Sequence, residues 1–116
     1  MSLKQLFTSF DGRINRQTFW IAFGLFVAVS VVAYIVALAI GIWFLWIVAL
    51  ALIYPQVAVG AKRFHDMGKP GMYMLIGLIP FVGGLILLIW LGVVEGDAAE
   101  NAYGAPMGGQ LQMSWS

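Results

Sequence analysis

Long apolar runs without any charged residue dominate the pattern along this chain. No Asp, Glu, Lys or Arg lies within positions 17–61, a run of 45 residues, or within positions 70–94, a run of 25. A helix that spans a membrane needs about 20 apolar residues. The first run therefore predicts two spanning helices, over residues 19–40 and 42–60, and the second predicts one, over residues 72–94.

A hairpin at Gly41 separates the first two predicted spans. As one continuous helix, the first run would extend about 68 Å, more than twice a hydrocarbon core of about 30 Å. Gly41 lies between the two halves, and glycine permits the positive φ that a tight turn often needs. Strands are disfavoured because a membrane barrel alternates apolar and polar residues, whereas these segments are apolar throughout.

The third apolar run is interrupted in its middle by Pro80 and the pair Gly83 and Gly84. A proline removes a backbone donor and kinks a helix, so the run is either a kinked span or a re-entrant hairpin. We expect the kinked span, since 25 residues are few for two legs and a turn. The hairpin alternative would return the C-terminal tail to the side on which the chain begins.

Short elements flank the predicted spans. Four apolar residues near the start repeat at helical spacing among polar ones: Leu3, Leu6, Phe7 and Phe10. This pattern predicts a short amphipathic helix on the membrane interface, and Asn15 is placed to cap the first span. Beyond the last span the chain is rich in Gly, Ala and Gln. We therefore expect one integral membrane domain over residues 1–106 and a flexible tail over residues 107–116.

The composition agrees with a membrane protein. Of the 116 residues, 62% are hydrophobic and 9% are charged, whereas a soluble domain is about 45–50% apolar and about 25% charged. So few charges cannot provide a polar surface, and disorder would need low hydrophobicity. The net charge of +1 gives no attraction to nucleic acid, and the absence of cysteine excludes disulfides and thiolate metal sites.

All six basic residues fall in two segments that a hairpin of two spans would bring to one side. They are Lys4, Arg13, Arg16, Lys62, Arg63 and Lys69. The positive-inside rule places that side, and the N-terminus with it, in the cytoplasm. The acidic residues after the last span do not fix the side of the C-terminus, because they contribute little to this rule.

Most of the reactive groups lie in residues 62–71, including the single histidine, His65, next to Asp66. One imidazole without cysteine cannot supply a zinc site, and adjacent residues of a helix do not face each other as a catalytic pair does. We therefore predict no metal and no other cofactor. The spans contain no Asp, Glu, His, Lys or Arg, which argues against a proton-coupled transporter.

Three roles are open to the arginines. They could bind an anion such as a lipid phosphate, because a guanidinium matches its geometry and basic clusters beside membrane helices attract anionic lipid. They could brace the fold through Asp66. They could also serve only as ordinary positive-inside charges.

Four short motifs, in order along the chain, carry a resemblance to a known family. They are Phe-x-Gly-Arg-x-x-Arg-x-x-Phe-Trp at residues 10–20, Arg-x-His-Asp-x-Gly-x-x-Gly at 63–71, Pro-x-x-Gly at 80–83 and Gly-x-x-x-x-Asn-x-Tyr-Gly at 96–104. Together they resemble the domain-of-unknown-function family 805, the YhaH-like bacterial inner-membrane proteins, over nearly the whole chain. The resemblance implies a small multi-pass protein of the bacterial inner membrane and brings no reaction with it.

The polar residues that this family pattern shares form one candidate cluster. Its members are Arg13, Arg16, Arg63, His65, Asp66, Asn101 and Tyr103. A positive-inside role requires only charge, so a pattern that specifies arginine, histidine and aspartate suggests defined hydrogen bonds. Those bonds could be structural or could belong to an anion-binding site.

We therefore expect an all-α membrane protein with a short interfacial helix, a transmembrane helical hairpin and a third transmembrane segment broken by Pro and Gly. Its expected function is non-enzymatic, with a basic cytoplasmic face that contacts anionic lipid or a protein partner, which could be a second copy. Two alternatives stay open. One is an oligomeric channel or transporter accessory subunit, and the other is a membrane enzyme acting on a lipid headgroup with His65 as general base.

Overall fold

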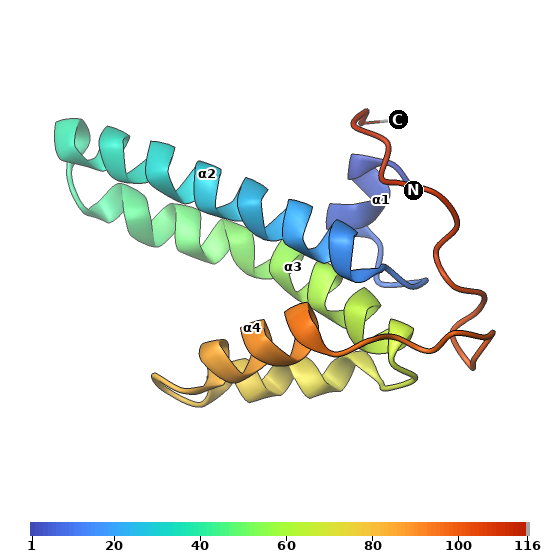
Figure 1. The fold of residues 1–116 in the computed structure, drawn as a ribbon. Coiled ribbons are helices and arrows are strands. Elements are labelled where there is room, and N and C mark those ends of the chain that lie inside the picture. Colours follow the sequence, from blue (N-terminus) through green and yellow to red (C-terminus); the bar gives the residue numbers. More distant parts are fainter. Residues whose placement is uncertain (116) are drawn as a thin grey trace.

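The computed structural model describes residues 1–115, which form helices joined by short turns and a long irregular C-terminal segment (Figure 1). The elements are α1 (Leu3–Thr8), α2 (Arg16–Ile40), α3 (Trp43–Asp66), the 3-10 helix η1 (Gly71–Leu78) and α4 (Gly83–Val93). Over the described residues the only β-type pairings are two isolated bridges. The all-helical class predicted from the sequence is confirmed.

The two longest helices, α2 and α3, form an antiparallel hairpin (Figure 1). The Asn15 side chain accepts a hydrogen bond from the Thr18 amide at 2.8 Å and caps α2, as the sequence predicts. Gly41 ends α2 with a φ of 114°, which favours glycine. Both helices are long and apolar enough to cross a membrane, yet only 17% and 22% of their most apolar windows are buried. A core helix of a soluble protein would be mostly buried.

The third apolar run is not the single kinked helix that we expected over residues 72–94 but two short helices, η1 and α4. η1 leads away from the end of α3, a turn at Pro80 reverses the chain, and α4 runs back alongside η1 (Figure 1). So short a reversal is possible because Gly83 packs directly on the backbone of η1, where a Cβ would collide with the Ile76 carbonyl oxygen. The hairpin alternative is therefore the one observed.

The predicted short N-terminal helix is α1, and it packs against the body of the protein. Its Leu6 side chain is fully buried. A capping box closes its start, in which the Ser2 side chain accepts from the Gln5 amide and the Gln5 side chain accepts from the Ser2 amide. The helix is thus fixed at both its apolar face and its first turn.

The tail after α4 returns to the N-terminal end of the chain and packs there (Figure 1). The Leu3 amide donates to the Ser114 carbonyl at 2.9 Å, and the Gln112 amide donates to the Met1 carbonyl at 2.9 Å. Leu111 is buried in the same apolar cluster as Leu6. The packed domain therefore extends past the expected boundary at residue 106, and both ends of the described chain lie at one end of the molecule.

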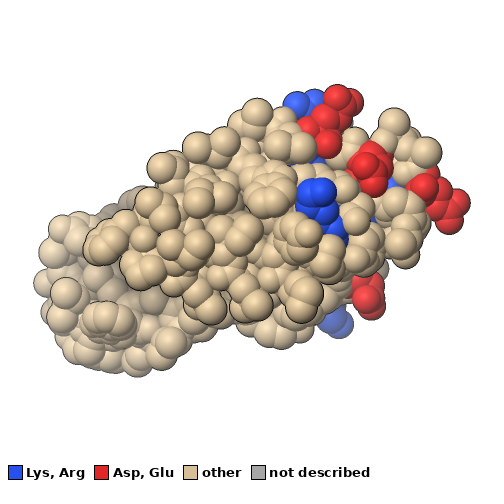
Figure 2. Space-filling view, turned by 90° about the horizontal axis from the view of Figure 1, so that it is seen from below, with Lys and Arg blue, Asp and Glu red and all other residues tan. Residues whose placement is uncertain are grey.

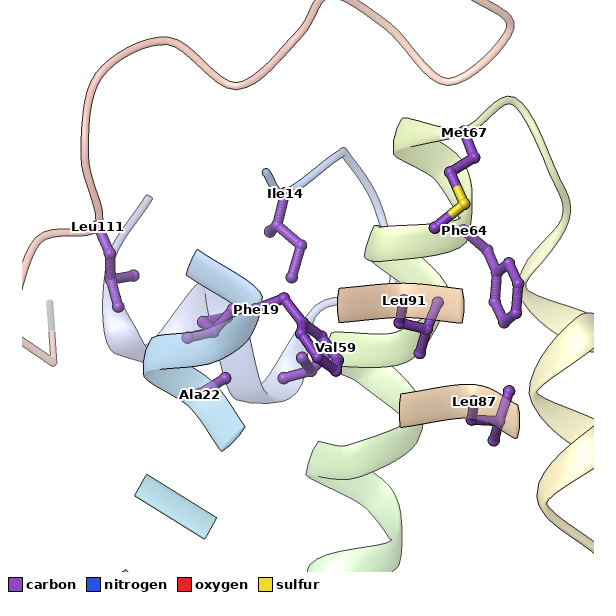
Figure 3. Packing of buried hydrophobic residues seen from close by; sticks show 10 residues of the cluster. Ile14, Phe19, Ala22, Val59, Phe64, Met67, Leu87, Leu91 and Leu111 are labelled. Carbon is purple, nitrogen blue, oxygen red and sulfur yellow. The ribbon is translucent and has the colours of Figure 1, made fainter. Parts of the chain in front are cut away.

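The core also lies at this end. Ten buried apolar side chains form one cluster there, to which α1, α2, α3, α4 and the tail all contribute (Figure 3). Charged side chains gather at the same end, while the rest of the surface in view carries none (Figure 2). The long arms of the molecule are thus apolar and exposed, and the polar contacts concentrate where the core is.

Candidate functional site

Asp66, the last residue of α3, joins two buried arginines. Its Oδ1 accepts a hydrogen bond from Arg13 Nε at 3.0 Å, and its Oδ2 accepts one from Arg63 Nη1 at 2.8 Å. Both arginine side chains are fully buried and the Asp66 side chain is 9% exposed. Arg63 lies one turn earlier on α3, whereas Arg13 comes from the turn before α2. Because a buried charge needs a partner, this unit holds the end of α3 and the start of α2 together.

Arg13 uses all five of its N–H donors inside the protein. Besides the Asp66 carboxylate, its terminal nitrogens donate to the backbone carbonyls of Asp66, Asp97, Ala99 and Gly104. Three of these carbonyls belong to the tail after α4. A guanidinium has five donors and no acceptor, so Arg13 has none left for a lipid phosphate. Its role in this structure is to fix the tail.

Arg63 fixes the end of α4 in a similar way. Its Nε donates to the Leu91 carbonyl at 2.7 Å, and its Nη2 donates to the Val94 carbonyl. The last carbonyls of a helix have no partner within the helix, and a cation is favoured there by the helix dipole. The buried arginine therefore satisfies the end of α4 and holds the second hairpin against α3.

Gly96 lets the tail pass close to the Asp66 carboxylate. A Cβ on Gly96 would overlap the Oδ2 atom of Asp66. The next residue reinforces this approach, because the Asp97 amide donates to the Asp66 carbonyl at 2.6 Å. The first glycine of the closing motif is thus required for its missing side chain.

His65, Asn101 and Tyr103 complete the contact between the end of α3 and the tail. The Tyr103 ring stacks on the His65 ring, with centroids 4.1 Å apart and planes at 4°. Asn101 Nδ2 donates to the His65 carbonyl at 2.9 Å. His65 Nδ1 lies 3.0 Å from the Gly12 carbonyl and carries the hydrogen in this contact, because a carbonyl only accepts. Six of the seven predicted site residues therefore meet in one place, and their contacts are internal.

The seventh, Arg16, stands apart from this cluster. It is exposed, and its Nη1 donates to one backbone carbonyl, that of Val93, at 3.2 Å. It forms no salt bridge with a carboxylate of residues 1–115. One turn further along α2, Trp20 Nε1 donates to the Gly92 carbonyl at 2.9 Å. These two bonds join the start of α2 to the end of α4.

A cavity of about 250 Å³ lies beside Arg16. Its lining includes three carboxylate residues, Asp66, Glu95 and Asp97. Asp66 is already paired with the two buried arginines, and Asp97 Oδ2 accepts from Asn101 Nδ2 at 2.9 Å. The Glu95 side chain is exposed and has no hydrogen-bond partner among residues 1–115. We call this space the Arg16 cavity.

A larger cavity of about 560 Å³ lies between the two hairpins. Most of its lining is apolar and comes from three helices, as in Phe19, Phe23 and Val27 of α2, Val59 of α3, and Leu87 and Leu88 of α4. Its polar lining residues are Ser30, Tyr34 and Gln56. We call it the inter-hairpin groove. His65 lines neither this groove nor the Arg16 cavity, so the geometry gives no support to a general base at His65.

The sequence reasoning missed the role of Lys62. Its side chain is fully buried, and Nζ donates to the carbonyls of Gln5 and Leu6, at 2.9 and 2.7 Å, and to that of Ser9. These carbonyls close α1, so the lysine holds α1 against α3. The sequence did contain a signal for this role. A helix of 6 residues leaves most of its carbonyls without partners inside the helix, and the ammonium group of a lysine offers three donors that can satisfy them.

The burial of three basic residues changes the charge of this end of the molecule. Arg13, Lys62 and Arg63 are internal. Three basic residues remain at least partly exposed, namely Lys4, Arg16 and Lys69, and four acidic residues are exposed, namely Asp11, Glu95, Asp97 and Glu100. The surface is therefore mixed in charge, whereas the sequence led us to expect a basic one.

Three proteins of Escherichia coli (strain K12) are similar to this chain over most of its length. Inner membrane protein YhaI is 27% identical over 107 residues, which cover 90% of each chain. Uncharacterized protein YiiR is 32% identical over 130 residues, covering 90% of this chain and 89% of its own. Inner membrane protein YhaH is 26% identical over 109 residues, covering 84% and 86%.

No solved structure gives a significant match. The family described as "Protein of unknown function (DUF805)" has a model that matches residues 7–105, the part of the chain that contains both hairpins and the whole polar cluster. The match covers well over half of the chain, which therefore belongs to the DUF805 family.

Proposed function

We propose that this chain is a non-enzymatic, multi-pass protein of the bacterial inner membrane that contacts phospholipid headgroups through Arg16 on its cytoplasmic face. In this arrangement α2 and α3 cross the bilayer. The hairpin of η1 and α4 enters and leaves on the cytoplasmic side, where both ends of the described chain also lie.

The dimensions of the long helices support this placement. α2 and α3 have 25 and 24 residues, about 36 Å at 1.5 Å per residue, which is enough for a hydrocarbon core of about 30 Å. Their apolar surfaces are largely exposed, and lipid would cover them. YhaI and YhaH are named inner membrane proteins, in agreement with this location.

The second hairpin suits the interior of the bilayer. Its legs have 8 and 11 residues, so each extends about 16 Å, roughly half of the hydrocarbon thickness. A backbone in hydrocarbon must satisfy its own polar groups. At the tip, the amides of Ile79, Val82 and Gly83 donate to nearby carbonyls, and Pro80 has no amide hydrogen. The Phe81 amide is the exception, with no carbonyl partner among residues 1–115.

The distribution of basic residues supports the orientation. All six Lys and Arg residues belong to α1, to the turn and first residue that begin α2, to the end of α3, and to the turn after α3. The opposite end of the long hairpin, around Gly41, carries none. By the positive-inside rule, the end that holds the chain termini faces the cytoplasm.

The exposed guanidinium of Arg16 is the observation that carries the lipid contact. Arg16 is the first residue of α2, where the charged end of the molecule meets the apolar arm. Its one partner among residues 1–115 is the neutral Val93 carbonyl, so several N–H donors remain for a phosphate, which a guanidinium binds through paired hydrogen bonds. Arg13 and Arg63 are buried and held by Asp66.

The variant Arg16→Gln tests this proposal. Protein purified in a mild detergent is assayed for bound phospholipid per chain. We expect Arg16→Gln to retain about two- to fivefold less than the wild type, as for the loss of one exposed ionic contact. Lys4→Gln removes the same charge from α1 and is the matched control. Equal retention by Arg16→Gln and the wild type would contradict the proposal.

A further inference from the structure

We infer that Arg16, the Arg16 cavity and the inter-hairpin groove form one site for a phospholipid that carries a primary ammonium group, as in an ethanolamine headgroup. The phosphate binds Arg16, the ammonium binds Glu95, and one acyl chain occupies the groove. The inference rests on the proposed lipid contact and names the lipid class that the contact selects.

The charges beside Arg16 match a headgroup of both signs. Arg16, Glu95 and Asp97 line the same cavity of about 250 Å³. An anionic headgroup without an amine would bring its charge close to two carboxylates, and like charges at short range repel. A phosphate next to an ammonium instead gives Arg16 an anion and gives Glu95 a cation. Glu95 is available for this role because it has no partner among the described residues.

The groove begins at Phe19, one turn after Arg16, and follows one face of α2. Arg16, Phe19, Phe23 and Val27 follow one another at intervals of three or four residues, so their side chains share that face. Figure 1 shows α2 and α4 close together near the charged end and diverging away from it. From Phe19 to Tyr34 the groove extends about 22 Å along α2, which is more than half of a hydrocarbon core of about 30 Å and is long enough for an acyl chain.

An acyl chain is the occupant that fits this lining. The volume of about 560 Å³ lies in the range of small-molecule sites, about 300–1,000 Å³, and the walls are mostly apolar. The groove ends where Arg16 and Trp20 bond to the carbonyls of Val93 and Gly92. A chain in the groove therefore leads to the guanidinium. A helix of a second copy could also cover the apolar lining of the groove. That occupant would not account for the charged side chains of Arg16 and Glu95 near the end of the groove.

Two glycines allow the groove to be filled with a matched control. Gly84 of α4 lines the groove and Gly24 of α2 does not. A Cβ on either glycine meets no atom within 4 Å, so both positions accept a side chain. Gly84→Phe should block the groove, whereas Gly24→Phe adds the same ring on a surface outside it.

Competition between two lipids tests the site. Wild type and variants, purified in detergent, are mixed with micelles holding equal amounts of phosphatidylethanolamine and phosphatidylglycerol, and the bound lipids are identified by mass spectrometry. We expect the wild type to prefer the ethanolamine lipid by about two- to fivefold, as for one exposed ionic contact. Glu95→Gln should abolish this preference, while Glu100→Gln, outside the cavity, should keep it. Gly84→Phe should lose bound lipid and Gly24→Phe should not.

Three results would overturn the inference. One is equal retention by Gly84→Phe and Gly24→Phe, and another is an unchanged preference in Glu95→Gln. The third is conversion of a dimer to a monomer by Gly84→Phe at unchanged lipid content, which would assign the groove to a second copy. If Arg16→Gln still loses lipid in these cases, the proposed lipid contact stands and only the site named here is wrong.

Discussion

Arg13 and Asp66, 53 residues apart in the sequence, form a buried ion pair with Nε and Oδ1 3.0 Å apart. This pair joins the turn before α2 to the end of α3. The other donors of Arg13 add the tail to the same point, and Arg63 adds the end of α4. The polar residues of the candidate cluster thus tie two hairpins and a tail together at one end of the molecule, while the apolar arms extend away from it.

Asp66→Asn should destabilise the protein strongly. It removes the carboxylate that pairs with both buried arginines, and breaking a buried pair from one side costs about 3–5 kcal/mol because the remaining charge is uncompensated. We expect a loss of that size in the free energy of unfolding, measured by denaturant titration in detergent with circular dichroism. Glu100→Gln, at an exposed carboxylate, should change it by about 0.5 kcal/mol or less. Equal stability of the two variants would show that the arginines do not depend on Asp66.

Gly96→Ala should loosen the tail. The added methyl group would overlap the Asp66 carboxylate, so the tail or the carboxylate must move, and such overpacking costs about 1–3 kcal/mol. Gly108 is the control, since a Cβ there meets nothing within 4 Å. Limited proteolysis should cut the tail of Gly96→Ala faster than that of Gly108→Ala. Equal cutting rates would mean that the close approach at Gly96 does not hold the tail.

The first hairpin could be predicted from the sequence and the second could not, for a physical reason. Charges mark the ends of the first apolar run and Gly41 marks its middle, so helix length alone decides its shape. In the second run, a span and a hairpin need the same apolar residues. Close packing selects the hairpin, because Gly83 approaches the backbone of η1 at Ile76 and Gly60 makes room for the Met74 side chain. Such contacts are not visible in composition or periodicity.

The sequence predicted which residues belong to the candidate site, but it did not predict what each of them does. The family motifs singled out seven residues, and six of them meet. Arg13 and Arg16 are the same residue type three positions apart, yet one is buried with all its donors used and the other is exposed. Lys62 was counted only as a positive charge, although it is buried against α1. Charge can be counted in a sequence, but which charges become internal depends on the tertiary contacts.

Lys62→Met should release α1 from α3. The methionine keeps an apolar stem but leaves the carbonyls at the end of α1 without the ammonium donors. A hydrogen bond from a charged group contributes about 1.5–3 kcal/mol, so we expect a loss of about that size in the opening free energy of α1. Hydrogen exchange of the α1 amides, followed by mass spectrometry, measures it. Lys4→Met, at an exposed lysine of the same helix, should leave the exchange unchanged, and equal exchange in both variants would contradict this role.

The sidedness of the second hairpin can be measured because the chain contains no cysteine. Single cysteines at three exposed positions report where each part of the chain lies relative to the membrane. The positions are Ile42 at the turn of the long hairpin, Phe81 at the tip of the short one, and Ser114 in the tail. A membrane-impermeant maleimide is added to spheroplasts and, separately, to inverted membrane vesicles. We expect Ile42→Cys to react only in spheroplasts and Ser114→Cys only in inverted vesicles.

Phe81→Cys should react from neither side, because each leg of the hairpin extends only about halfway through the hydrocarbon. Reaction of all three cysteines after solubilisation in detergent is the control for reactivity. A single span over residues 72–94 makes the opposite prediction for the tail, since it would expose Ser114→Cys in spheroplasts. That result would also separate Leu3 from Ser114, whose backbone hydrogen bond of 2.9 Å requires both ends of the chain on one side of the membrane. The position of one cysteine therefore decides between the re-entrant hairpin and the kinked span.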